Sequence, residues 1–221
     1  MLHKTRGIVF RFTKYGETSI IVTIFTELFG LQSYIVNGVR SKSGKNKIAF
    51  FQPLTLLDLV VYHREHANIS RIKEVKCLYP YQSIPTNIKK STLAMFLVEV
   101  VNRTIKEESH AQALCEFLVQ SFITLDQMEE KTENFHLLFL LKLSRYLGFG
   151  AHHVNDIVST RFTTDENEKI ISALLNSGYT DFILMSNHQR REILDLILKF
   201  YADHIENLGE IKSIQILREI F

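Results

Sequence analysis

Four positively charged residues lie close together in a stretch that has no apolar side chain. They are Arg40, Lys42, Lys45 and Lys47, and they alternate with small polar residues. Cations at this spacing neutralise successive phosphates of a nucleic acid, because each contact releases condensed counterions. A segment with nothing to bury belongs on the surface. We therefore expect residues 40–47 to form an exposed, mobile loop that follows a phosphate backbone.

Further cations lie in the strands that would position this loop. Arg6, Arg11 and Lys14 belong to the first predicted strand and its turn, and Lys73 and Lys76 belong to the fifth. The predicted DNA-binding residues are Arg6, Arg11, Lys14, Arg40, Lys42, Lys45 and Lys47. Tyr15, Tyr34 and Tyr62 are candidates for stacking on bases, although each is equally suited to a core. With few such rings, we expect binding that tolerates any sequence.

The net charge also differs between the two parts of the chain, and the positive part is the one that contains these cations. Residues 1–90 contain fourteen Lys or Arg against five Asp or Glu, a net charge of +9. Residues 91–221 contain twelve against nineteen, a net charge of −7. Such asymmetry favours a polyanion as the partner of the front half and proteins as partners of the back half.

No group of residues in the sequence has the composition expected of a catalytic site. Cys115 and His110 lack a supporting third group, and His63 and His66 flank what reads as a hairpin tip. His152, His153 and Asp156 stand close together, but a structural zinc site prefers four ligands and thiolates. We therefore expect no catalytic residue, no metal site, no cofactor and no enzymatic activity.

Periodicity divides the chain into a β-rich front and a helical back, which is an α+β fold. Residues 1–80 alternate with period two, and Pro80 and Pro85 mark the change to a helical period in residues 81–221. The predicted strands cover residues 7–13, 19–25, 31–36, 54–62 and 69–78. Five short strands with glycine or polar turns favour a small closed barrel, and an SH3-like barrel would give the same pattern.

The predicted helices cover residues 91–106, 109–125, 135–147, 169–175, 190–205 and 211–221. The third is apolar nearly all round, which predicts a central position. Ser109, Asn134 and Asn187 are the predicted N-caps. Residues 151–168 lose the pattern and are expected to form an irregular excursion.

Bulk composition excludes several classes of protein. With 46% hydrophobic and 23% charged residues the chain is not disordered, and no apolar run is long enough to span a bilayer. The first residues lack the apolar segment of a secretory signal. Two cysteines are too few for a disulfide framework. A cytoplasmic, nucleoid-associated location is the simplest expectation.

Several motifs in register resemble one family of bacterial recombination mediators. They occur in the family's order along nearly the whole chain, as Gly16-Glu17-Thr18-Ser19-Ile20 through Phe25-Thr26-Glu27-Leu28-Phe29-Gly30, Asn37-Gly38-Val39-Arg40-Ser41-Lys42, Phe51-Gln52-Pro53-Leu54, Tyr146-Leu147-Gly148-Phe149-Gly150 and Ile211-Lys212-Ser213. Their combination resembles the RecO family, although no single motif is specific.

The resemblance implies an N-terminal OB-fold barrel, an all-α C-terminal domain and a non-enzymatic role in recombinational repair. Such proteins bind single- and double-stranded DNA, anneal complementary strands, and work with RecR to load the recombinase RecA on DNA coated with single-strand binding protein (SSB). The acidic, apolar SSB tail binds the helical domain, where Arg145 and Lys212 are the candidate residues. Many relatives carry a four-cysteine zinc module that residues 151–168 lack, so we expect no zinc.

Two other interpretations remain open. A barrel of this kind also suits an RNA- or ribosome-associated binding module. Alternatively, the basic loop contacts an acidic protein, and the chain is an adaptor.

Overall fold

The structure of the protein is a computed structural model that describes residues 1–41, 47–64, 67–106, 111–158 and 163–221. The chain divides into two compact units. The first, the barrel unit, comprises Met1–Tyr81 with Ile105–Ile123, and the second, the helical unit, comprises Gln82–Thr104 with Thr124–Phe221. The predicted domain boundary at residue 80 stays a prediction.

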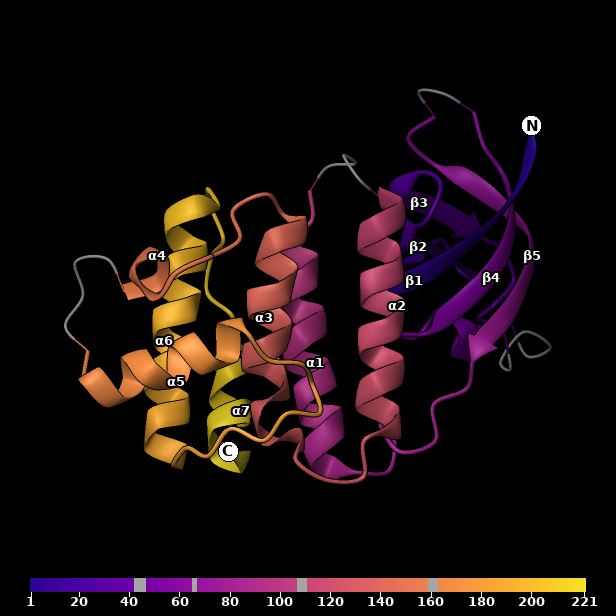
Figure 1. Ribbon diagram of the computed structural model, residues 1–221. Coiled ribbons are helices and arrows are strands. Elements are labelled where there is room, and N and C mark those ends of the chain that lie inside the picture. The colour runs from indigo at the N-terminus through magenta and orange to yellow at the C-terminus, as the bar shows by residue number, and fades with distance from the viewer. Residues whose placement is uncertain (42–46, 65–66, 107–110, 159–162) are drawn as a thin grey trace. The chain divides into compact units, whose positions relative to one another are not determined.

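The barrel unit contains five strands in its described residues, and Figure 1 shows them curling round one another. They are β1 (Leu2–Tyr15), β2 (Ser19–Thr26), β3 (Gly30–Val36), β4 (Leu56–Tyr62) and β5 (Ser70–Tyr79), with a short 3-10 helix, η1 (Ile48–Phe51), before β4. The prediction of five strands in this order is confirmed. The long helix α2 (Ala111–Gln127) belongs to this unit as far as Ile123.

The strands close into a barrel in the order β1-β2-β3-β5-β4. Neighbouring strands are antiparallel except β3 and β5, which pair in parallel through Tyr34 with Ser70 and Ile35 with Arg71. β1 is shared: its first half pairs with β4 and its second half with β2, with a register shift between Val9 and Arg11. This closed five-stranded barrel is OB-like, which excludes the SH3-like alternative.

Alternating apolar side chains fill the barrel. Those of β1, β2 and β4 meet Tyr34, Val39 and Phe51 in one core. Gly7 lets β1 approach β2 closely, because a Cβ atom there would lie 2.7 Å from Cγ2 of Ile24. Gly16, with a φ of +54°, forms the turn between β1 and β2, as its flanking residues predict.

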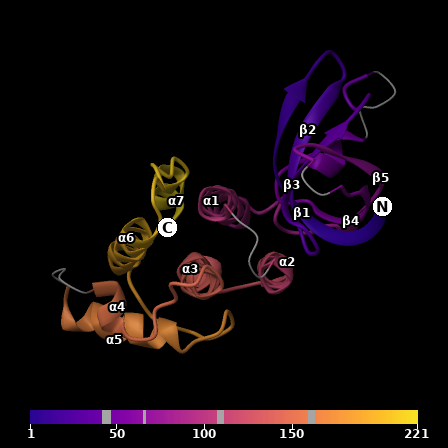
Figure 2. The same ribbon diagram turned by 90° about the horizontal axis from the view of Figure 1, so that it is seen from above.

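The helical unit holds the remaining helices of the described chain. They are α1 (Ile88–Thr104), η2 (Thr132–Asn134), α3 (Phe135–Tyr146), α4 (Val154–Val158), α5 (Asp165–Leu175), α6 (Asn187–His204) and α7 (Ile214–Ile220). In Figure 2, α4 and α5 lie on one side of α3 and α6, with α1 and α7 on the other. α3 is buried along most of its length, which confirms its predicted central position.

Three details of the helical prediction are wrong. The excursion 151–168 contains the helix α4, and α5 begins at Asp165, capped by Thr164, whose side chain accepts a hydrogen bond from the backbone of Asn167. α6 is capped by Ser186 in a capping box with Gln189, one residue before the predicted cap.

Two other predicted caps have different outcomes. Asn134 stands at the N-cap of α3 but makes no capping hydrogen bond. Its side chain instead donates to the carbonyl of Ile183 and accepts from Nε of Arg190. Ser109 lies outside the described residues.

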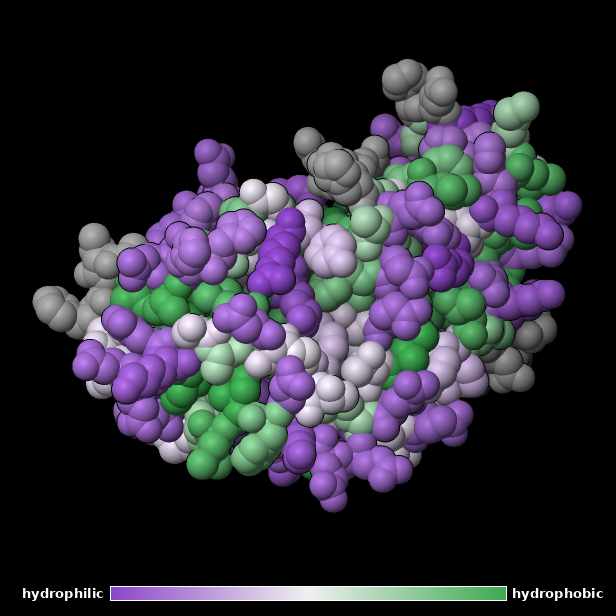
Figure 3. Space-filling view, in the orientation of Figure 1, coloured by the Kyte–Doolittle hydropathy of each residue, from purple (hydrophilic) through white to green (hydrophobic). Residues whose placement is uncertain are grey.

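Hydrophilic side chains cover most of the face shown in Figure 3, with separate hydrophobic areas between them. The most exposed large apolar side chains in the described part of the helical unit are Leu184, Ile88 and Phe182, at 79%, 68% and 66%. Among the described helices, none combines the length and hydrophobicity that crossing a membrane requires.

Candidate nucleic-acid surface and helical pocket

Arg40 joins the segment after β3 to the turn between β1 and β2. Its Nη2 donates to the carbonyl oxygen of Gly16 at 3.2 Å and to that of Glu17. Its backbone N–H donates to the carbonyl oxygen of Thr18 at 3.0 Å. The start of the predicted basic loop is therefore fixed against the β1–β2 hairpin.

Two further predicted cations lie on the same hairpin. Arg11 pairs in register with Thr23, and Lys14 pairs with Ile20. Both side chains are exposed, as is Lys47 just before η1, and none of the three forms an ion pair with the described residues. The structure thus brings Arg11 and Lys14 together with Arg40 on connected segments. Lys42 and Lys45 lie outside the described residues.

Arg6 has a different environment from the other predicted cations. Its Nη2 lies 2.7 Å from Oε1 of Glu27 and 2.7 Å from Oε2 of Glu116, and its Nε donates to Oε2 of Glu27 at 3.0 Å. The hydrogen bond to Glu27 is the main reason why the pKa of Arg6 is raised, and in turn it lowers the pKa of Glu27. Arg6 therefore ties β1 to α2, and its charge is offset. Its role in DNA binding stays a prediction.

The three candidate stacking residues differ in exposure. Tyr15 and Tyr62 are 52% and 47% exposed, whereas Tyr34 is fully buried in the barrel core. Burial also raises the pKa of Tyr34. Only Tyr15 and Tyr62 therefore have rings that a base can reach. Lys73 and Lys76 are exposed on β5.

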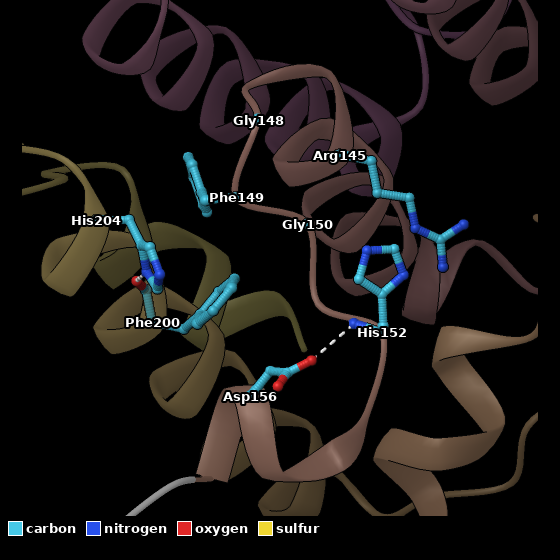
Figure 4. Close-up of a pocket in the computed structure, with 8 residues that line it drawn as sticks. All are labelled: Arg145, Gly148, Phe149, Gly150, His152, Asp156, Phe200 and His204. Carbon is cyan, nitrogen blue, oxygen red and sulfur yellow. Dashed lines mark hydrogen bonds between the residues drawn. The ribbon is translucent and has the colours of Figure 1, made fainter.

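The helical unit contains a pocket of about 550 Å³ at the end of α3, shown in Figure 4. Its lining comprises Arg145, Gly148, Phe149, Gly150, His152, Asp156, Phe200 and His204. Aromatic rings form one side of it: Phe149 stacks on His204 with centroids 5.0 Å apart, and Phe200 lies 4.6 Å from His204. Nδ1 of His204 is bonded to the carbonyl of Phe200 at 2.9 Å.

Gly148 and Gly150 shape the backbone between the aromatic side of the pocket and Arg145. Gly148 has a φ of +87°, which suits glycine, and a Cβ atom on Gly150 would lie 2.5 Å from Cγ of Arg145. Arg145 donates through Nη2 to the carbonyl of Leu175 at 2.9 Å, which fixes one end of its guanidinium. In Figure 4 the side chain of Arg145 and the aromatic rings lie on opposite sides of the backbone that carries Gly148, Gly150 and His152.

Lys212, the other residue predicted for tail binding, is not part of this lining. Its side chain is exposed, and its backbone N–H donates to Oε1 of Glu99 at 3.0 Å. Sequence reasoning also missed the aromatic residues of the pocket. Phe200 and His204 stand four apart on one helix, and this spacing was the available signal.

The remaining chemical candidates have structural roles or lie outside the described chain. Oδ2 of Asp156 accepts the backbone N–H groups of His152 and His153 at 2.8 and 2.9 Å, and these bonds lower the pKa of Asp156. Within the described residues no three His, Cys, Asp or Glu side chains come together as metal ligands. With Cys77 and Cys115 as its only cysteines, the chain does not fit a four-cysteine zinc module.

The two remaining candidate groups are Cys115 with His110 and His63 with His66. Cys115 is buried, and burial raises the pKa of its thiol to about 12, which disfavours a nucleophilic thiolate. His63 stacks on Phe29 with ring centroids 3.8 Å apart. His66 and His110 lie outside the described residues.

An OB-like barrel that presents exposed cations, followed by a helical region with an aromatic pocket, defines the architecture of this chain. Comparison with known sequences identifies its family. Residues 1–81 match the family described as Recombination protein O N terminal, and residues 85–174 match Recombination protein O C terminal. The chain therefore belongs to the RecO family.

Full-length relatives agree with this assignment. The chain is 35% identical to the DNA repair protein RecO of Bacteroides fragilis, with all of both chains covered. It is also 35% identical to that of Christiangramia forsetii over the full length of both, and 33% identical to that of Flavobacterium johnsoniae over 99% of this chain and 98% of the relative.

Proposed function

We propose that this RecO-family DNA repair protein is a non-enzymatic mediator that binds single- and double-stranded DNA and anneals complementary strands. The observation that carries this proposal is the set of exposed cations around the Arg40-held hairpin. Annealing follows physically if neutralised strands repel each other less while their bases stay accessible. The proposed location is cytoplasmic, at the nucleoid.

Salt dependence tests whether phosphates are what these cations bind. If Arg11, Lys14, Arg40 and Lys47 each make one contact, log K should fall with log salt at a slope of about −3 on single strands, since each contact contributes about −0.7. Contacts from Lys42 and Lys45 would steepen the slope. A slope near zero would remove the proposal.

Charge reversal in the basic loop provides the matching genetic test. Replacing Lys42, Lys45 and Lys47 together by Glu should weaken DNA binding strongly and flatten the salt slope. A suitable control reverses the charge of Lys169, which is exposed on α5 and forms no ion pair with the described residues. Unchanged annealing by the triple variant would refute the assignment of this loop.

The second part of the proposal concerns loading. We propose that the protein works with RecR to help a recombinase such as RecA assemble on SSB-coated DNA, and that the acidic, apolar SSB tail binds the helical unit. The pocket supports this because Arg145 supplies a cation and Phe149 and Phe200 an apolar wall. Lys212 remains the second proposed contact, at a position outside the pocket lining.

Binding of an SSB-tail peptide tests Arg145 and Lys212 separately. Anisotropy of a labelled SSB-tail peptide should show weaker binding by Arg145→Ala and Lys212→Ala than by the control Lys169→Ala. Full affinity in Arg145→Ala would exclude the pocket. An annealing assay titrated with salt, with and without SSB coating and RecR, then tests the function as a whole.

The two alternatives make different predictions in the same assays. An RNA- or ribosome-associated module would prefer RNA when RNA and DNA oligomers compete. An adaptor would leave oligonucleotides unretarded at moderate salt. Family membership over the full chain favours DNA.

A further inference from the structure

The turn between β1 and β2 is held from outside the hairpin. Besides the bonds from Nη2 of Arg40 to Gly16 and Glu17, the backbone N–H of Arg40 bonds to Thr18. Three consecutive carbonyl groups of the turn therefore accept hydrogen bonds from one residue. A lysine keeps the charge and the backbone bond, but its compact ammonium on a flexible stem does not hold the fixed position of the guanidinium Nη2 that makes the two side-chain bonds.

A second bond joins the same two segments. Oγ of Ser19, at the start of β2, bonds to Oδ1 of Asn37 at 3.0 Å, directly after β3. Gly16 and Gly38 both have positive φ values, of +54° and +72°, so each segment bends sharply where it meets the other. The hairpin end is therefore a fixed platform, although its residues are exposed.

Tyr15 is the last residue of β1 and stands directly before this turn. Its ring is 52% exposed, and within the described chain it stacks on no other ring and makes no side-chain hydrogen bond. Arg11 and Lys14 lie on the same strand. Because side chains alternate along a strand, Tyr15 shares a face with Arg11, and Lys14 lies on the opposite face. A half-exposed aromatic ring on the same face as a cation is a combination that binds single strands, because every base offers a face for stacking.

We infer that Tyr15 stacks on bases of single-stranded DNA and that Arg40 is a positioning residue that holds the turn carrying it. This inference rests on the proposed DNA binding and adds to it a preference for single strands. The bases of a duplex are already stacked on one another, so Tyr15 should contribute little there. Phosphate contacts supply affinity for both forms of DNA, whereas the ring distinguishes them.

Variants of Tyr15 test the stacking contact in the full-length protein. With a labelled single-stranded oligonucleotide, Tyr15→Ala should bind about tenfold more weakly, whereas a duplex of the same length should bind within about twofold of wild type. The salt slope should stay unchanged, since no phosphate contact is lost. Tyr15→Phe keeps the ring and should retain wild-type affinity.

Two further variants control for the loss of an exposed ring. Phe182→Ala removes an exposed aromatic side chain of the helical unit and should leave both affinities unchanged. Tyr62→Ala removes the other exposed tyrosine of the barrel. If Tyr62→Ala lowers single-strand affinity and Tyr15→Ala does not, the stacking assignment is overturned.

Arg40→Lys tests the positioning role because it keeps the charge. An oligonucleotide with 2-aminopurine reports stacking directly, through quenching of its fluorescence when saturated with protein. Arg40→Lys should lose most of this quenching, as Tyr15→Ala does, while its salt slope stays within about one contact of wild type. Wild-type quenching in Arg40→Lys would show that only its charge matters and would overturn the positioning role.

The outcomes separate this inference from the function on which it rests. If wild-type protein fails to bind either form of DNA at low salt, the proposed function itself fails. If wild type binds both forms with a clear salt slope and Tyr15→Ala matches Phe182→Ala on single strands, only the stacking inference fails.

Discussion

Asp126 holds the start of the helical unit, and replacing it by Asn should destabilise the protein. Its carboxylate accepts backbone N–H groups from Gln82 at 2.9 Å, Ser83 at 2.8 Å and Ile84 at 2.9 Å. Nζ of Lys90 donates to the carbonyl oxygen of Asp126 at 2.7 Å and to Oγ of Ser83 at 2.6 Å. Both Asp126 and Lys90 are buried, at 4% exposure each.

The magnitude follows from what an amide can replace. Asparagine keeps the acceptor oxygen Oδ1, which the N–H groups of Ser83, Ile84 and, at 3.1 Å, Gln82 already reach, so these bonds survive without their charge and the second bond of Gln82, to Oδ2, is lost. Each of the three backbone hydrogen bonds contributes about 1.5–3 kcal/mol with a charged acceptor and about 0.5–1.5 kcal/mol with a neutral one, so each loses about 1 kcal/mol. We therefore expect Asp126→Asn to lower the free energy of unfolding by about 3 kcal/mol.

Urea unfolding at pH 7 measures this loss, and thermal unfolding should show a fall in Tm of about 6–12 °C. Glu130→Gln is the matched control, because this carboxylate is exposed near the same helix end and its loss should change stability by less than about 0.5 kcal/mol. Lys90→Met should couple to Asp126→Asn in a double-mutant cycle, since the two side chains share Ser83 and the end of α2. Stability of Asp126→Asn equal to that of the control would refute the reasoning.

Three other changes have defined outcomes. Burial, helped by the charge of Arg190, lowers the pKa of His136 to about 3, so the unfolded chain takes up a proton that the folded one refuses. Stability should therefore fall by about 1.4 kcal/mol per pH unit from about pH 6 to 4, and His136→Leu should lose this dependence in urea unfolding at several pH values. Glu116→Gln removes one of two carboxylates that offset Arg6, so low-salt DNA affinity measured by anisotropy should rise about two- to fivefold; a decrease would contradict this. Gly150→Ala places a methyl group against Arg145, so it should cost about 1–3 kcal/mol and weaken tail-peptide binding, and wild-type values of both would show that the pocket adapts.

The barrel was predictable from the sequence because its strands are local patterns. Period-two alternation and glycine turns locate all five strands. The first five residues of β1 were missed because they pair only with β4, as Leu2 does with Tyr62. That ladder joins residues sixty positions apart, and no local pattern encodes it.

Helix starts show the opposite kind of error, since the missed signal was local. Ser186 and Asn187 are both good N-caps, and only the Gln three residues after Ser186 distinguishes them. Asn134 has the residue type of a cap, yet its side chain bonds to Ile183 and Arg190, which come close only in the folded helical unit. Cap propensity thus predicts the place of a helix start better than the bond that is made there.

The sequence predicted many of the residues of the candidate site, but it did not predict which other residues they contact. Arg40 was expected to bind phosphate directly, and its contacts to the β1–β2 turn could not be read from the sequence. Arg6 looks like its neighbours until folding brings Glu116, 110 residues away, within 2.7 Å. The aromatic pocket joins the end of α3 to two residues of α6, again across a long stretch of chain.

Some cations of the barrel unit already form ion pairs with carboxylates and others do not, and this difference determines how readily each can bind DNA. Binding a phosphate through Arg6 would require loss of its bonds to two carboxylates, each charge-assisted. Arg11, Lys14 and Lys47 form no ion pair with the described residues, so they can release counterions without breaking one. A small set of such contacts gives affinity that moderate salt reverses. That suits the proposed annealing, because a strand that has found its complement must leave the protein.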